Sequence, residues 1–283
     1  MKNVVITGVS TGIGHGAVAV MIKKGWHVFG SVRKESDGQK LKREFGEAFV
    51  PLVFDVQDND AILEASEKVR AHLSGNTLDG LVNNAGSSYP GPLLVQSVAE
   101  FRAQIDINLV GMFAVTRAFA PLLGADPELK GNKGRIVNLS SIGGKFGVPF
   151  LGAYAAAKHG VEGFSESLRR ELQLIGIDVI IIGPGSVNTA IWDKAENISF
   201  DHLSGTIWEK PFRAFTKSMI DNGRKGYSTI HVGEVIATAL TVSRPCTRYP
   251  VVKGKFQNFT LPMLLPSRTV DGLLGKQFGL LPK

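Results

Sequence analysis

The sequence predicts an α/β fold in which helices flank a doubly wound parallel β-sheet, in a single domain that spans residues 1–283. The first observation is that short runs of aliphatic and β-branched residues alternate with helical segments as far as Gly185, as in successive β-α-β units. The second is that these runs are apolar without interruption, which is typical of parallel strands buried on both faces. The third is a glycine-rich turn at the first junction between a strand and a helix.

The first predicted strand covers residues 3–7, and a helix over 17–25 follows it. The turn between them reads TGVSTGIG, with glycines at Gly8, Gly12 and Gly14. Its spacing has one residue more than G-x-G-x-x-G. Glycines at such a junction let the backbone approach a pyrophosphate, and the helix N-terminus supplies free N–H groups. We therefore expect a dinucleotide to bind here.

The end of the second strand, residues 26–32, bears on the choice of cofactor. A carboxylate at this point binds the hydroxyls of the adenosine ribose, whereas a basic group suits a 2′-phosphate. Here Arg33 and Lys34 follow the strand directly. This pair predicts NADP(H). The alternative is that both are solvated surface charges, and NAD(H) is kept as the second candidate.

Four further strands follow, and most of them end in small or polar residues. In such sheets ligands bind beyond the carboxyl ends of the strands, so the polar residues at those ends should gather on one edge. The predicted strands are 48–56, 78–86, 134–140 and 177–185, separated by helices over 35–46, 58–74, 99–123 and 153–175. The residues expected on the edge are Thr7, Gly8, Val32, Arg33, Asp55, Asn83, Ser141 and Pro184.

After Gly185 the alternation stops. An insertion over residues 190–230 is rich in large apolar side chains, after which a helix over 231–243 and a last strand over 248–252 are predicted. The extension over 253–283, called the tail below, is both apolar and basic. The apolar residues of the insertion are Ile191, Trp192, Ile198, Phe200, Trp208, Phe212, Phe215 and Met219.

Tyr154 and Lys158 lie in an alanine-rich segment that favours a helix. Residues four apart share a helix face, so the phenol and the ammonium are expected to be neighbours. A nearby positive charge lowers the pKa of a tyrosine, which would let Tyr154 exchange a proton near neutral pH. The alternative is an amphipathic helix with a packed tyrosine and an exposed lysine.

Composition and charge argue against several classes of protein. The net charge is +7, but no basic helix or zinc-ligand spacing accompanies it, so no nucleic acid is expected as a partner. The six histidines show no metal-ligand spacing, so no metal is expected, and the single Cys246 cannot form an internal disulfide. We find no signal-peptide core and no run of ~20 apolar residues. A cytoplasmic protein without a transmembrane segment is therefore expected.

Five motifs in order over residues 3–190 resemble the short-chain dehydrogenase/reductase family: TGVSTGIG, NNAG, a strand ending in Ser141, Tyr154-x-x-x-Lys158 and PGSVNT. The resemblance implies a Rossmann-like fold and an oxidoreductase that transfers hydride between a nicotinamide cofactor and a carbonyl or alcohol. A non-catalytic protein that senses the dinucleotide is the alternative. The four residues Asn108, Ser141, Tyr154 and Lys158 argue against it, since a sensor does not need all four.

The resemblance also implies roles for individual residues. Tyr154 would be the acid/base, and Lys158 would lower its pKa and hold the nicotinamide ribose. Ser141 would hydrogen-bond the substrate oxygen, and Ser140 could replace it only if the turn were shifted. Asn108 would continue a proton relay through water, unless it is a satisfied polar group in a kinked helix.

The cofactor contacts are implied in the same way. Asp55 and Val56 would meet the adenine, with a helix N-cap as the alternative for Asp55. Residues 83–86 would support the sheet and contact the adenosine ribose, and residues 187 and 189 would meet the nicotinamide carboxamide. Thr11 stands where some NADP-preferring members carry a basic residue. The full predicted set is Gly8, Ser10, Thr11, Gly12, Ile13, Gly14, Arg33, Lys34, Asp55, Val56, Asn83, Ala85, Gly86, Tyr154, Lys158, Pro184, Gly185, Val187 and Thr189.

The pattern after residue 240 resembles the branch with retinol and 17β-hydroxysteroid dehydrogenases. It implies a lipophilic alcohol or ketone as substrate, with an NAD-dependent dehydrogenase of a small alcohol as the alternative. The insertion is expected to be a mobile lid, and the tail to pack beside it and wall an apolar pocket. A homo-oligomer is expected. Five basic residues leave contact of the tail with a membrane surface as another outcome.

Overall fold

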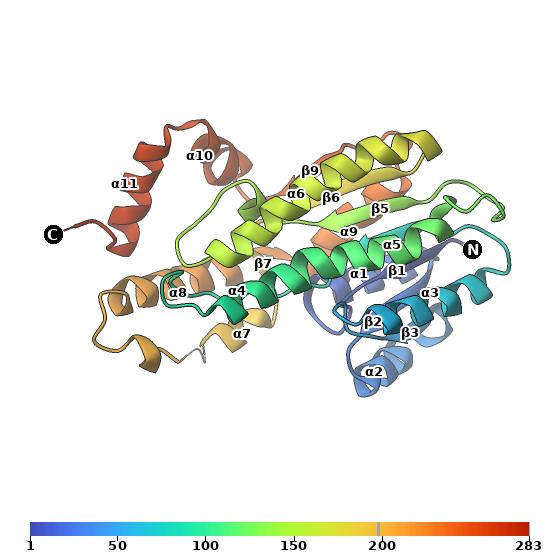
Figure 1. Ribbon diagram of the computed structural model, residues 1–283, viewed down its shortest axis with the longest axis horizontal. Coiled ribbons are helices and arrows are strands. Elements are labelled where there is room, and N and C mark those ends of the chain that lie inside the picture. The colour runs from blue at the N-terminus through green and yellow to red at the C-terminus, as the bar shows by residue number, and fades with distance from the viewer. Residues whose placement is uncertain (197–198, 283) are drawn as a thin grey trace.

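Seven parallel strands form the central sheet, in the order β3-β2-β1-β4-β5-β6-β9 (Figure 1). The order reverses direction between β1 and β4, so the predicted doubly wound, Rossmann-like sheet is confirmed. This computed structural model describes residues 1–196 and 199–282. Ile198 and Lys283, which the sequence analysis counted in the insertion and the tail, lie outside the described residues. The strands are β1 Asn3–Ile6, β2 His27–Val32, β3 Phe49–Val53, β4 Gly80–Asn83, β5 Arg135–Leu139, β6 Asp178–Pro184 and β9 Arg248–Val251.

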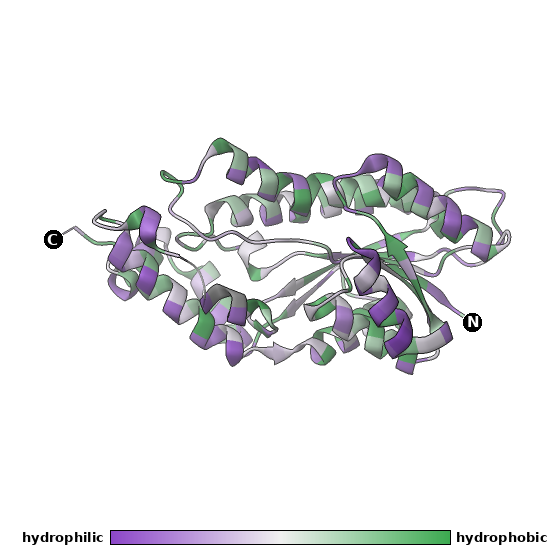
Figure 2. Ribbon diagram, turned by 90° about the horizontal axis from the view of Figure 1, so that it is seen from below, coloured by the Kyte–Doolittle hydropathy of each residue, from purple (hydrophilic) through white to green (hydrophobic). Residues whose placement is uncertain are grey.

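The strands are apolar throughout because helices cover both faces of the sheet (Figures 1 and 2). Successive residues of β1 show it: Val4 and Ile6 belong to one core cluster and Val5 to the other, and all three are fully buried. The first cluster packs under α1 (Gly12–Lys23), α2 (Glu35–Phe45) and α9 (Thr229–Thr241). The second packs under α3 (Asn59–Leu73) and α5 (Gly111–Phe119).

The third strand is shorter than predicted. β3 ends at Val53, so Asp55 lies two residues beyond the strand and does not end it. Asp55 accepts a hydrogen bond from the amide of Gln57, 3.0 Å away, in a turn. The N-cap of α3 is Asp58, whose side chain accepts from the amide of Ala61. The alternative role of Asp55 as a helix N-cap is therefore wrong, because the N-cap lies three residues later, at Asp58.

The helical stretch around Asn108 is continuous but irregular, as the interrupted apolar pattern indicated. α4 (Val98–Ile105) begins at a capping box of Ser97 and Glu100. A π-helical turn over Asp106–Val110 contains Asn108, and α5 follows it. Such π turns are frequent at functional sites, because they redirect one side chain out of the helical register.

By length and composition alone, the stretch Val98–Leu123 would suffice to cross a membrane. Apolar helices in protein cores meet the same criterion. This one packs against α3, α6 (Gly152–Leu172) and β4, and it carries the buried polar residues Gln104, Asn108 and Thr116. We therefore see no clear membrane-spanning helix within residues 1–196 and 199–282.

The insertion is closed at its base by a second, two-stranded sheet that the sequence analysis missed. β7 (Val187–Asn188) pairs in parallel with β8 (Tyr227–Ser228). Two-residue strands carry no hydrophobic periodicity, so nothing in the pattern predicted them. Between them lie α7 (Ile191–Glu196) and α8 (Glu209–Arg224).

The tail packs against the insertion, as predicted. It contains α10 (Leu261–Leu264) and α11 (Ser267–Phe278), which lie at the same end of the molecule as α8 (Figure 1). The ring of Phe278 meets Phe215 of α8 edge-on, with centroids 5.6 Å apart. Phe150, Phe212 and Leu203 complete this buried aromatic cluster.

Candidate active site

The glycine-rich turn brings the backbone of β1 close to that of β4. Gly8 has a φ of +70°, and a Cβ there would lie 2.8 Å from the Cα of Ala85. A Cβ on Gly14 would lie 2.3 Å from the carbonyl oxygen of Gly8. Only glycine fits either position, so the turn has one shape.

The turn is also fixed by Asn84, which lies within the predicted stretch 83–86 but is absent from the full predicted set of cofactor residues. Its Nδ2 donates to the carbonyl oxygens of Thr7 (2.8 Å) and Gly8 (3.0 Å). In return, the Thr7 hydroxyl accepts from the amides of Asn84 and Ala85, each at 2.9 Å. The signal was present in the NNAG motif, but sequence alone did not show which asparagine turns toward β1.

Asn83, by contrast, points into the core. It is 2% exposed, and its Nδ2 donates to Thr116 Oγ1 and Asn138 Oδ1, both at 2.9 Å. Asn138 in turn donates to Ser165 of α6. Asn83 therefore ties the sheet to the helices on one face, which is the supporting part of the role predicted for it.

The N-terminus of α1 has the features of an anion site. Its N-cap, Thr11, makes no side-chain capping bond, and the first turn contains no acidic residue. The free N–H groups and the positive end of the helix dipole are thus available to a phosphate. Arg33 and Lys34 are exposed directly after β2, and Ser31 of β2 accepts a 3.0 Å bond from the amide of Gly8.

The other predicted cofactor residues lie mainly along the carboxyl edge of the sheet. Ser10 and Gly86 are exposed, whereas Val56 and Val187 are buried. A Cβ on Gly12 would lie 3.7 Å from the Thr189 methyl, so the turn after β7 closes over the glycine turn. Ile13, Asp55, Ala85, Gly185 and Thr189 are partly exposed, and Pro184 is buried at the end of β6.

Ser141 and Tyr154 meet at the end of β5. The Ser141 hydroxyl lies close enough to the Tyr154 phenol to lower its pKa, and Ser141 Oγ donates to the carbonyl oxygen of Pro184 at 3.5 Å. Ser141 also caps the following turn, its Oγ accepting from the amide of Gly143 at 3.0 Å. Ser140 is 5% exposed and packs under Gly144, so Ser141 is the serine that faces the tyrosine.

Lys158 lies one turn after Tyr154 on α6 and is 3% exposed. Its Nζ donates to the carbonyl oxygen of Leu139, 2.9 Å away, and lies 5.7 Å from the centre of the Tyr154 ring. Burial lowers the pKa of Lys158 to about 8. Tyr154 and Lys158 are neighbours, as predicted, but the Lys158 amine donates its hydrogen bond to the backbone carbonyl of Leu139.

The predicted lowering of the Tyr154 pKa is therefore wrong in sign for the protein without bound ligand. Burial raises the pKa of Tyr154, and the hydrogen bond from Ser141 only partly opposes this. Desolvation disfavours the phenolate, while the Lys158 ammonium donates to the Leu139 carbonyl and lies 5.7 Å from the centre of the Tyr154 ring. Tyr154 is consequently a neutral acid in this state.

Asn108 lies within this group of side chains. It is fully buried, its Nδ2 donates to the carbonyls of Ser87 and Gln104 at 2.8 Å, and its Oδ1 accepts from the amide of Ser87. A Cβ on Gly86 would lie 2.7 Å from Asn108 Oδ1 and 3.7 Å from Lys158 Nζ. Asn108, Gly86 and Lys158 are thus adjacent.

These residues together fit a dinucleotide. The uncapped helix end and the glycine turn can take a pyrophosphate, and the group of Ser141, Tyr154 and Lys158 lies further along the same carboxyl edge. Among the residues that the structure describes, no cluster of histidine, cysteine or acidic side chains could hold a metal ion.

Several known proteins are similar to this chain. The family model for short chain dehydrogenases matches residues 2–198. An NADPH-dependent 3-dehydrocapnine reductase of Ornithobacterium rhinotracheale is 33% identical over 276 residues, covering 98% of this chain and 97% of the relative. Retinol dehydrogenase 16 of Mus musculus is 33% identical over 285 residues, covering 96% and 87%. A solved short-chain dehydrogenase from Streptomyces avermitilis has the same fold, with a TM-score of 0.76, 22% identity, and coverage of 97% and 96%.

Proposed function

The chain belongs to the short-chain dehydrogenase/reductase family of oxidoreductases, in its retinol dehydrogenase-like branch, and from this premise we propose that it transfers hydride between NADP(H) and a hydrophobic alcohol or ketone. The observation that carries the proposal is that Ser141 and Tyr154 lie side by side against Gly143, with the buried Lys158 one helical turn after Tyr154. The NADPH-dependent relative supports the choice of cofactor.

Each catalytic residue has a role that its surroundings support. The nicotinamide, when bound, supplies or accepts the hydride. Tyr154 donates a proton to the substrate oxygen during reduction, and its raised pKa keeps it protonated until then. Ser141 hydrogen-bonds the same oxygen. Lys158 contributes positive charge beneath the phenol as the proton leaves.

The lipophilic substrate is proposed from the surroundings of this group. Phe150, four residues before Tyr154, is part of the aromatic cluster with Phe212 and Phe215 of the insertion. A cavity of about 450 Å³ lies between residues 147–149 and α11, lined in part by Val148, Leu274 and Leu280; neither Ser141 nor Tyr154 lines it. The names of both relatives, a 3-dehydrocapnine reductase and a retinol dehydrogenase, support reduction or oxidation of such a compound.

The proposal is tested by following NADPH consumption at the nicotinamide absorbance. The panel contains 3-dehydrocapnine, retinaldehyde, steroid ketones and small water-soluble ketones. Turnover of one or more of the large ketones with NADPH supports the proposal. Turnover of small alcohols with NAD alone would favour the alternative dehydrogenase, and cofactor binding without any turnover would favour the dinucleotide sensor.

The cofactor preference is expected to depend on Arg33. We predict that Arg33→Ala raises KM for NADPH about tenfold or more, the value of one charged hydrogen bond to a phosphate, and leaves KM for NADH unchanged. Lys40→Ala, which removes another exposed positive charge, on α2, is the control and should change neither KM. A wild-type enzyme that prefers NADH would refute this prediction.

The insertion is proposed to be a lid. Trp192 of α7 donates through Nε1 to the carbonyl of Val187 at 2.7 Å, and Arg224 of α8 pairs with Glu196 of α7 at 2.7 Å. None of the described side chains of α7 is buried, whereas Phe212 and Phe215 anchor α8 in the aromatic cluster. Segments with few buried contacts open most readily, so α7 is expected to move most. Bound NADPH and substrate should therefore slow amide hydrogen exchange across α7 and α8. Equal exchange with and without both ligands would rule out a lid.

A further inference from the structure

Arg248, on the outermost strand of the sheet, makes a contact with the active site that no sequence motif predicts. Its Nη2 lies 3.3 Å from the carbonyl oxygen of Ser141 and donates to it. Arg248 begins β9 and is paired with Ile181 of β6. A Cβ on Gly183 would lie 2.4 Å from Arg248 Nη2, so the glycine of β6 leaves the space through which the guanidinium reaches Ser141.

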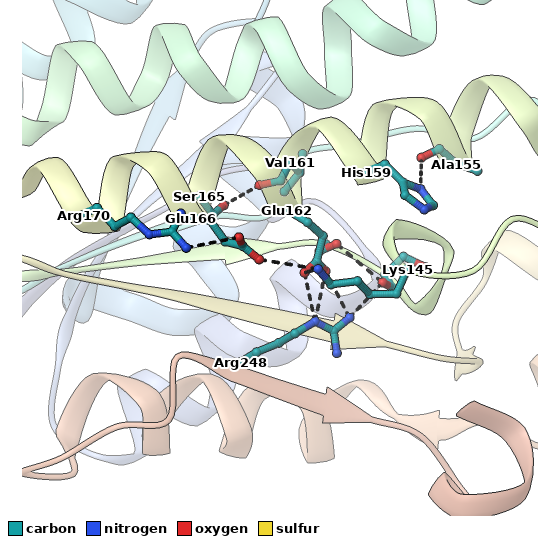
Figure 3. Close-up of polar contacts among 11 residues, drawn as sticks. Lys145, Ala155, His159, Val161, Glu162, Ser165, Glu166, Arg170 and Arg248 are labelled. Atoms are coloured by element: carbon teal, nitrogen blue, oxygen red, sulfur yellow. Dashed lines mark hydrogen bonds and ion pairs between the residues drawn. The ribbon is translucent and has the colours of Figure 1, made fainter. Parts of the chain in front are cut away.

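The guanidinium is held in place by Glu162 of α6 (Figure 3). Nε of Arg248 donates to both carboxylate oxygens of Glu162, at 3.1 and 3.0 Å, and Nη2 donates to Oε1 at 3.0 Å. The Glu162 side chain is 3% exposed and that of Arg248 is 17% exposed. A bidentate pair of this kind fixes orientation as well as distance.

The same carboxylate also holds the other end of the segment that begins with Ser141. Lys145 Nζ lies 3.4 Å from Glu162 Oε2 and 3.6 Å from Glu166 Oε1. Between the two ends, a Cβ on Gly144 would lie 2.8 Å from the carbonyl oxygen of Lys158. The segment 141–145 therefore lies flat on α6, fastened at both ends through Glu162.

Glu162 continues a regular row on α6. Tyr154, Lys158 and Glu162 are spaced by four residues and face the same strand end. Tyr154 meets the side chain of Ser141, Lys158 meets the carbonyl of Leu139, and Glu162 reaches the carbonyl of Ser141 through Arg248. Two of these contacts belong to the catalytic group already described. The third has no role in it.

We propose that Arg248, oriented by Glu162, is a positioning residue that holds the Ser141 backbone so that the serine hydroxyl stays against Tyr154. This inference rests on the proposed function of Ser141 and Tyr154. The outer side of the guanidinium lies 5.2 Å from the centre of the Phe259 ring, which shields the pair at the start of the tail. Arg248 contacts Ser141 through the backbone carbonyl and not through the serine hydroxyl.

The decisive variant is Arg248→Lys. A lysine keeps the positive charge beside Glu162 but has no nitrogen equivalent to Nη2, which donates to the Ser141 carbonyl. We expect kcat to fall about tenfold or more, the effect of losing one hydrogen bond from a charged donor. KM for NADPH should stay within about twofold, because the anion site at α1 is not involved.

The matched control is Arg135→Lys, at the opposite end of β5. Arg135 is equally buried, with 18% of its side chain exposed, and it pairs with Asp178 at 3.3 Å. Its Nη1 donates to the carbonyls of Ala239 and Val242. This variant removes the same kind of contact far from Ser141, so it should lose similar stability and keep kcat.

Two readouts separate positioning from a purely structural effect. The pH profile of kcat/KM should show a higher apparent pKa for Tyr154 in Arg248→Lys, because the serine bond that lowers it is weakened. Amide exchange at residues 142–145 should also accelerate in Arg248→Lys and not in Arg135→Lys. The exchange measurement needs no turnover, so it tests the contact even if no substrate is found.

A milder variant covers the case in which Arg248→Lys does not fold. Lys145→Gln changes a partly exposed residue and releases only the far end of the segment, so we expect about a threefold loss of kcat with the same direction of pH shift. Unchanged kcat, pH profile and exchange in these variants, or an equal loss of kcat in Arg135→Lys, would overturn the proposal. An inactive wild type with faster exchange in Arg248→Lys would instead overturn the proposed function alone.

Discussion

Replacing Tyr154 by phenylalanine should reduce kcat by about 10²–10⁴-fold, the usual contribution of a positioned general acid. The change removes one oxygen and leaves the ring in place, so the surrounding packing is preserved. Losing the polar contact with Ser141 should cost at most about 1 kcal/mol of stability. NADPH affinity, measured by fluorescence titration, should be unchanged, because the anion site at α1 is untouched.

Tyr249→Phe is the matched control. The Tyr249 hydroxyl accepts a 2.9 Å bond from the amide of Cys246, so this change also removes one bonded hydroxyl. It should leave kcat unaltered. A Tyr154→Phe enzyme with near wild-type turnover would exclude Tyr154 as the acid.

The second large effect concerns Lys158 and the stability of the cofactor-free protein. Its pKa is about 8 in the fold and 10.5 as the ordinary value. Between these pH values the unfolded chain carries the proton and the folded chain does not, so the free energy of unfolding rises with pH. The full rise is about 3 kcal/mol, at 1.36 kcal/mol per pKa unit. Below pH 8 the cost of burying the charge is fully present.

Urea unfolding at pH 7 to 9.5 measures this rise directly. Lys158→Met removes the titrating group and should abolish most of the slope with pH. Lys24→Met is the control, since it removes a largely exposed ammonium paired with Glu234, and should keep the wild-type slope. The Tyr154 phenol acts in the opposite direction above pH 10, because its raised pKa keeps the folded state protonated. A wild-type protein whose stability is flat over pH 7 to 9.5 would show that Lys158 is not desolvated.

The fold class followed from the sequence alone, which also predicted Ser141, Tyr154 and Lys158 as candidate site residues that the structure brings together. Local patterns suffice for the fold, because continuous apolar runs indicate which segments are strands. Glycines such as Gly8 and Gly14 indicate where the backbone approaches another segment closely. The four-residue spacing of Tyr154 and Lys158 places them on one helix face in any helix. Packing of the tail on the insertion was one of the predicted outcomes, and Phe278 does pack on Phe215 there, while Phe256, Leu264 and Leu273 of the tail stay exposed.

The surroundings of these residues, and hence their pKa values and hydrogen-bond partners, depend on long-range packing. The sign of the Tyr154 pKa shift depends on burial and on the bond between Lys158 and Leu139, neither of which has a local signature. The two adjacent asparagines look alike in the sequence. The Asn83 side chain supports the sheet through Asn138, whereas the Asn84 side chain bonds Thr7 and holds the glycine turn. Arg248 is separated from Ser141 by 107 residues, and the two meet because β9 docks beside β6. Contacts of this range arise from strand order, which a local sequence pattern does not encode.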